Sequence, residues 1–176
     1  MDFQIFEGNS NHVMDLLEDG TVDIGIIREP FNTSLYHAIL IRDEATDDDE
    51  SDYFAAVGTP SFFEDVPSDA ISLEALKGKP LIIHRRYNDV IMNACRQRGF
   101  SPNIICQNTE ISSSISWAEA GIGVAIVSYK SAVQTMNDKV IIKKIVQPTI
   151  STKSFLVWNT DKHIANIVKQ FTQLFE

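Results

Sequence analysis

Two adjacent arginines follow an apolar stretch and could recognise an anion. Arg85, Arg86 and Tyr87 come directly after the run Leu81 to His84, which is typical of a buried strand. Two guanidinium groups at a strand end suit bidentate binding of a carboxylate or a phosphate. Solvated surface arginines, or partners for acidic residues, would give the same pattern. The sequence therefore leaves both interpretations open.

Four further residues stand at expected strand or helix ends, where open α/β sheets hold ligands. Ser10 stands where the turn Gly8-Asn9 gives way to an expected helix, and a helix N-terminus favours anions, although helix capping alone explains a serine there. Arg28 ends an apolar strand and could face a ligand or make a structural ion pair. Thr109 and Glu110 precede another expected helix, where capping is the competing explanation.

Signatures of enzymes and of metal sites are missing from the sequence. It contains no G-x-S-x-G, H-E-x-x-H or P-loop motif, and Gly121-Ile122-Gly123 precedes a strand, where a tight turn explains the glycines. Ser10 with His12 or His84 is a weak nucleophile–base candidate without a third orienting group. The two cysteines, Cys95 and Cys106, are expected as buried free thiols. We expect no catalysis, metal or cofactor.

Alternating periodicities predict an α/β fold. Apolar runs predict strands, and 3.6-residue periodicity predicts helices, of which 60–64 and 73–77 are short. Strands that alternate with helices favour a mostly parallel arrangement. The expected strands are 2–6, 22–27, 38–42, 53–57, 81–84, 103–107, 123–127, 140–145 and 154–158, and the expected helices are 11–19, 60–64, 73–77, 88–98, 111–120 and 162–175.

Composition limits the partners. The 176 residues carry a net charge of −9, with an acidic run from Asp43 to Asp52 that interrupts the pattern and is typical of a solvated loop. Proteins that bind nucleic acid usually present a basic surface, so we expect no DNA binding by this polypeptide itself. No apolar run approaches the roughly 20 residues that span a bilayer, and no signal peptide is visible, so we expect a cytoplasmic protein without membrane contact.

Four motifs, in this order, resemble the effector-binding domain of LysR-type transcriptional regulators. They are E-G-N-S at Glu7–Ser10, D-I-G-I-I-R-E-P-F at Asp23–Phe31, the approach to a strand at Ile71–Ile83, and the helix-to-strand turn at Ala118–Val127. Ser128 stands where the family pattern usually has proline. The resemblance implies a two-lobed, periplasmic-binding-protein-like fold of type 2, with mixed sheets and flanking helices. Lobe one would be 1–50 plus 149–176, and lobe two would be 51–148.

The resemblance also implies a function and partners. The expected function is inducer sensing, in which a small effector, expected to be an organic anion, binds between the lobes. The implied effector-binding residues are Ser10, Arg28, Arg85, Arg86, Tyr87, Thr109 and Glu110. A homodimer or higher homo-oligomer would form through helices 11–19 and 88–98. DNA would be bound only through an N-terminal winged helix-turn-helix that is absent here, as are the first strand and helix of the domain, so the fold is expected to be incomplete at its N-terminus. A solute-binding protein of the same fold and a non-functional gene fragment are the alternatives.

Overall fold

The chain folds into two compact units. The computed structural model describes residues 4–41, 52–135, 137–161 and 165–175. The chain passes from the first unit to the second between Ser51 and Asp52 and returns between Thr152 and Lys153. The sequence prediction had placed the two crossings after residues 50 and 148. The acidic run 43–52 lies outside the described residues except for Asp52.

The first unit is built on a small antiparallel sheet with the strand order β1-β10-β2. Helix α1 packs on it, because Leu17 of α1 is buried together with Ile27, Tyr36 and Val157 of the three strands. Gly20 adopts a positive φ of 82° and ends α1, as a glycine C-cap commonly does. The elements are α1 (Ser10–Asp19), β1 (Gly25–Arg28), β2 (Tyr36–Leu40), β10 (Ser154–Asn159), α5 (Asn166–Thr172) and a 3-10 turn, η4 (Gln173–Phe175).

The second unit contains a larger mixed sheet with the order β4-β8-β3-β7-β5-β6, and β9 pairs with β3 off this path. The strands β5, β6 and β7 are parallel, whereas β3 runs antiparallel to β7 and β8. The strands are β3 (Asp52–Gly58), β4 (Ala70–Ser72), β5 (Pro80–His84), β6 (Asn103–Asn108), β7 (Val124–Ser128), β8 (Ile141–Val146) and β9 (Ser151–Thr152). The helices are α2 (Asn88–Gln97), α3 (Ile111–Glu119) and α4 (Tyr129–Gln134), with the 3-10 turns η1 (Pro60–Phe62), η2 (Leu73–Leu76) and η3 (Arg85–Tyr87).

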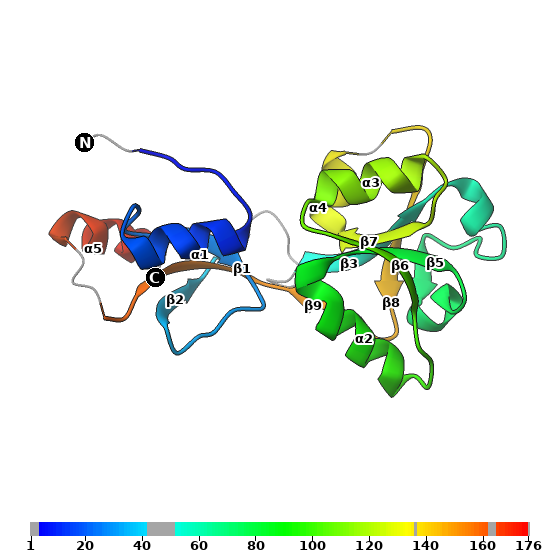
Figure 1. Ribbon diagram of the computed structural model, residues 1–176, viewed down its shortest axis with the longest axis horizontal. Helices are drawn as coiled ribbons and strands as arrows, with labels where there is room; N and C mark the ends of the chain where they lie inside the picture. Colours follow the sequence, from blue (N-terminus) through cyan, green and yellow to red (C-terminus); the bar gives the residue numbers. More distant parts are fainter. Residues whose placement is uncertain (1–3, 42–51, 136, 162–164, 176) are drawn as a thin grey trace. The chain divides into compact units, whose positions relative to one another are not determined.

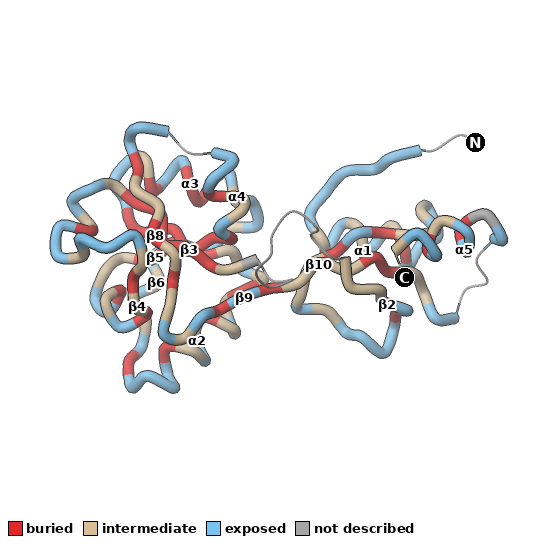
Figure 2. The backbone as a smooth tube through the Cα atoms, turned by 180° about the vertical axis from the view of Figure 1, so that it is seen from behind, coloured by how far each residue is buried: buried red, intermediate tan, exposed pale blue. Residues whose placement is uncertain are grey.

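Helices cover both faces of this sheet (Figure 1). Helix α2 packs on one face, where Ile91 and Cys95 join the larger apolar cluster, and α3 and α4 pack on the other, where Ala118 and Ala132 join a second cluster. The backbone coloured by burial shows the buried residues concentrated along the central strands (Figure 2). This two-sided burial explains why Leu81, Ile82 and Ile83 read as one continuous apolar run.

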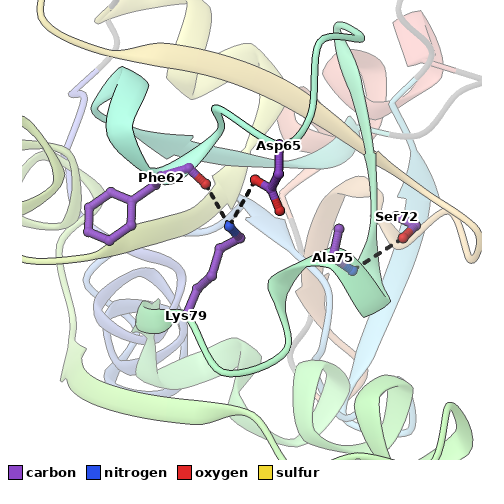
Figure 3. Close-up of polar contacts among 5 residues, drawn as sticks. All are labelled: Phe62, Asp65, Ser72, Ala75 and Lys79. Atoms are coloured by element: carbon purple, nitrogen blue, oxygen red, sulfur yellow. Dashed lines mark hydrogen bonds and ion pairs between the residues drawn. The ribbon is translucent and has the colours of Figure 1, made fainter.

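Two lysines hold the irregular segment 59–69 to the second unit. Lys79 Nζ donates to the Phe62 carbonyl oxygen at 2.8 Å and lies 3.3 Å from Asp65 Oδ1 (Figure 3). Lys143 Nζ donates to the Ser68 carbonyl oxygen at 2.6 Å and lies 5.7 Å from the centre of the Phe63 ring. The segment is therefore held by two ammonium groups, at Phe62 and Asp65 and at Ser68.

Several expected elements differ from the structure. Residues 4–6 form no strand, and Ile5 is 84% exposed, because no strand in the described part of the chain pairs with them. The last helix begins at Asn166, whereas a helix from 162 was predicted; residues 162–164 are not described. The short elements β4, β9 and α4 were not predicted. The arrangement is also less parallel than expected, since the whole first sheet and the contacts of β3 are antiparallel.

Candidate functional site

The predicted residues of the second unit lie at one edge of its sheet. Because β5, β6 and β7 are parallel, their carboxyl ends meet at the same edge, and ligands of open α/β sheets bind outside such ends. Arg85–Tyr87 follows β5, Thr109 and Glu110 follow β6, and Ser128 ends β7. The structure thus brings together five of the residues predicted from sequence.

These five residues differ in their accessibility. Arg85, Thr109 and Glu110 are exposed and Arg86 is half-buried. Tyr87 is buried, and its ring lies 4.8 Å from the ring of Phe54 in an edge-to-face arrangement. The tyrosine therefore anchors the η3 turn in the core, while Arg85 and the turn after β6 are exposed to solvent.

His84 connects the ends of β5 and β6. Its Nε2 lies 2.7 Å from the Thr109 carbonyl oxygen, and its Nδ1 accepts the Arg86 backbone N–H at 3.2 Å. Burial lowers the pKa of His84 below its ordinary value of 6.5; the Arg86 charge acts in the same direction, and the Thr109 carbonyl and Glu110 oppose it. Sequence analysis considered His84 only as a weak catalytic base and missed this linking role. Its place at the end of an apolar run was the available signal.

Helix starts add positive potential to the same edge. Helix α2 begins directly after Tyr87, and α3 begins directly after Glu110. Glu110 holds the N-cap position of α3, but its side chain makes no capping hydrogen bond, so capping does not explain this glutamate. Instead, the Ser114 hydroxyl and the Asn108 amide are hydrogen-bonded at 3.0 Å across the turn. Backbone N–H groups at a helix start favour an anion nearby.

In the first unit, Ser10 does not cap α1. Asn9 is the N-cap, and its Oδ1 accepts the backbone N–H groups of Asn11 and His12 at 3.1 Å each. Ser10 Oγ instead accepts the Arg28 backbone N–H at 3.1 Å. The expected cap was wrong by one residue, because asparagine caps as well as serine and lies in the extended conformation that a cap requires. Ser10 joins the start of α1 to the end of β1.

Ser10 and Arg28 lie at the end of the first unit where the chain returns from the second. Glu29, which follows Arg28, donates its backbone N–H to the Lys153 carbonyl oxygen at 3.0 Å. Lys153 donates its own N–H to Glu29 Oε2 at 3.2 Å, and Lys153 is the first residue after the crossing. The structure thus places Ser10 next to Arg28 in the first unit and the other five predicted residues at one sheet edge of the second unit. That one ligand contacts both sets stays a prediction.

Ser10 and His84, named above as a weak nucleophile–base candidate, both contact backbone groups. Ser10 Oγ is bound to the Arg28 N–H, and both ring nitrogens of His84 contact backbone groups. Among the described residues, no group of three or more His, Cys, Asp and Glu side chains could hold a metal ion. No helix among them is both long and apolar enough to cross a membrane.

Comparison with known proteins decides the family. The sequence pattern of the LysR substrate binding domain matches residues 1–176. The chain belongs to this LysR family. It is 25% identical over 166 residues to the uncharacterized HTH-type transcriptional regulator YwbI of Bacillus subtilis, covering 93% of this chain and 52% of that protein. It is 27% identical over 177 residues to the HTH-type transcriptional regulator AlsR of the same organism, covering 97% and 55%.

The LysR fold is confirmed by solved structures. The effector binding domain of QuiR in complex with shikimate matches with a TM-score of 0.77 at 16% identity, covering 97% of this chain and 78% of that one. The predicted periplasmic-binding-protein-like α/β fold is therefore correct. The chain spans about half the length of the curated LysR relatives that it matches. The members of this family, including both relatives, are transcriptional regulators and not enzymes, as the resemblance in the sequence implied.

Ser128, where the LysR pattern usually has proline, has a local structural role. Its Oγ accepts the Ser131 backbone N–H at 3.3 Å and donates to the Ser131 hydroxyl at 2.7 Å. Ser128 is thus the N-cap of α4, the helix that the sequence analysis did not predict. A serine at the end of a strand was the signal for this helix start.

Proposed function

We propose that this chain is the ligand-sensing part of a cytoplasmic LysR-type transcriptional regulator and that its ligand is a small organic anion contacted by both units. The observation that carries this proposal is the convergence of Arg85, Arg86 and two helix starts at one edge of the second sheet. The chain has 24 acidic and 15 basic residues, so its overall field repels anions and attraction must be local.

Chain connectivity supports a contribution from each unit. Strand β3 begins at the edge of the second unit that carries Arg85, because Phe54 lies opposite Ser128 in the antiparallel pair. The crossing into the second unit is therefore next to that edge, as the return crossing is next to Ser10 and Arg28 in the first unit. We propose that Ser10 and Arg28 contact the ligand from the first unit. In the QuiR complex the bound molecule is shikimate, which is a carboxylate.

Regulation would follow from a difference in affinity. A ligand that binds one arrangement of the two units more tightly than another shifts the population toward it, without covalent chemistry. We propose that this shift is passed to DNA through other parts of the regulator and through a homodimer or higher homo-oligomer, formed by α1 and α2. The 1–176 chain itself should bind no DNA duplex selectively, because it is acidic overall.

A thermal-shift screen of carboxylates, phosphates and neutral analogues tests the ligand class. Calorimetry then compares the wild type with the variant Arg85→Gln/Arg86→Gln. One charge-assisted hydrogen bond contributes about 1.5–3 kcal/mol, so we expect at least about a tenfold loss of affinity. The matched control is Lys77→Gln/Lys139→Gln, which removes the same charge from exposed positions of the same unit outside α2. A neutral best ligand, or equal losses in both variants, would contradict the proposed site.

A further inference from the structure

The two ring nitrogens of His84 define one protonation state. A backbone N–H only donates, so Nδ1, which faces the Arg86 N–H at 3.2 Å, must be the unprotonated acceptor. The proton of a neutral ring then lies on Nε2, which donates to the Thr109 carbonyl oxygen at 2.7 Å. The geometry therefore suits the neutral imidazole and not the imidazolium, in which both nitrogens donate.

These contacts position the proposed anion site. Residues 84 and 109 are 25 positions apart, and the imidazole links the turn after β5 to the turn after β6. We infer that His84 is a positioning residue whose neutral ring holds the Arg85–Tyr87 turn, and that protonation of His84 releases this turn and weakens anion binding. The predicted effect of His84 protonation on anion binding rests on the proposed function, whereas its predicted effect on the turn does not.

The charged groups around His84 set the pH range of this effect. Arg86 lies on the same turn, Glu110 lies on the turn after β6, and the Tyr87 ring is 5.5 Å away. Burial is the largest influence and lowers the pKa of His84, with Arg86 acting in the same direction and Glu110 in the opposite one. The lowered pKa favours the neutral ring, so the midpoint of protonation lies below 6.5, the ordinary histidine value.

Protonation would place two donors against each other. The new proton on Nδ1 would point at the Arg86 N–H, so one of the two groups must move and the turn loses its cap. A charged imidazole would, by Coulomb attraction alone, strengthen the binding of an anion nearby. The two effects have opposite signs. The direction of the pH dependence therefore distinguishes a positioning role from a direct electrostatic role.

The effect on the turn can be measured without any ligand. His84 is the one histidine between positions 52 and 152, so nitrogen-15 NMR of the second unit reports its tautomer directly. We expect the Nε2–H tautomer at about pH 7.5. On acidification, at the pH where the nitrogen-15 signals show that the ring has become protonated, the exchange protection of the Arg86 amide should fall about fivefold, the ratio that corresponds to one net hydrogen bond. In His84→Asn, whose Oδ1 can accept the same N–H but does not titrate, the protection should stay constant. The exposed His37→Asn should behave as the wild type.

Sulfate, which stays doubly charged over this pH range, serves as the anion probe. We expect its affinity to fall about fivefold between about pH 7.5 and the pH at which His84 is protonated in the wild type, and to stay constant over the same range in His84→Asn. Arg86 protection that does not change as His84 becomes protonated, or sulfate affinity that rises on this protonation, would overturn the inference. If sulfate binds at neither pH while Arg86 protection still falls on acidification, the positioning role stands and the proposed anion site is wrong.

Discussion

Replacement of Gly123 by alanine should destabilise the second unit far more than replacement of its neighbour Gly121. A Cβ atom at Gly123 would lie 2.6 Å from the Pro80 carbonyl oxygen and 3.3 Å from Ile105 Cδ1. The nearest of these atoms belongs to the backbone of β5, which cannot rotate away as a side chain can. At Gly121 the backbone has a φ of 73°, but the nearest atom would be 4.0 Å from a Cβ. The two glycines are therefore required for different reasons.

The magnitude follows from this geometry. Ordinary contact begins at 3.4 Å, so relief of the clash at Gly123 requires a displacement of 3.4 − 2.6 = 0.8 Å between the amino ends of β5 and β7. Overpacking of this kind costs about 1–3 kcal/mol, and a backbone contact belongs at the upper end of this range. Alanine in the left-handed conformation costs about 1–2 kcal/mol. We expect Gly123→Ala to cost about 3 kcal/mol and Gly121→Ala about 1 kcal/mol.

Urea unfolding followed by tryptophan fluorescence can measure this difference in each unit separately. Trp117 lies in the second unit and Trp158 in the first, and the chain contains 2 tryptophans. In a Trp158→Phe background the signal therefore reports the second unit alone. Gly121→Asn should recover part of the loss of Gly121→Ala, because asparagine tolerates positive φ. An equal or smaller cost for Gly123→Ala than for Gly121→Ala would refute the reasoning.

Three further predictions concern single side chains. Burial raises the pKa of the Cys95 thiol to about 11, so this thiol is protonated at about pH 8. A thiol reagent should therefore modify Cys95 only after unfolding, whereas Cys106 should react in the native state. Lys143 is 4% exposed, and its replacement by alanine should lower the free energy of unfolding by about 2–4 kcal/mol. In the same urea assay, Lys139→Ala at an exposed position should change it by no more than about 0.5 kcal/mol. Ser10→Ala removes the acceptor of the Arg28 N–H and should lower the stability reported by Trp158 by about 1 kcal/mol. Ser10→Thr should restore this stability. No change in Ser10→Ala would contradict the 3.1 Å hydrogen bond.

Much of the fold could be predicted because burial leaves a trace in the residue pattern. The strands β5 and β7 are covered on both faces, so each reads as an uninterrupted apolar run. Helix α2 has one buried face, which gives the 3.6-residue period around Ile91 and Cys95. The strands β4 and β9, of three and two residues, are too short to carry a period and form because longer strands offer them partners.

The candidate site was predictable only in part, because the sequence marks where a strand ends but not which ends are neighbours. Apolar runs placed Arg85 and Thr109 each after a strand, yet only the parallel pairing of β5 with β6 brings the two turns together. His84 shows the limit most directly, since a histidine at the end of an apolar run gives no sign of a carbonyl 25 residues away. The arginines that would bind an anion could be identified by their chemistry. The residue that holds their turn could be identified only by its two hydrogen bonds, so tests of this site need His84 variants as well as arginine variants.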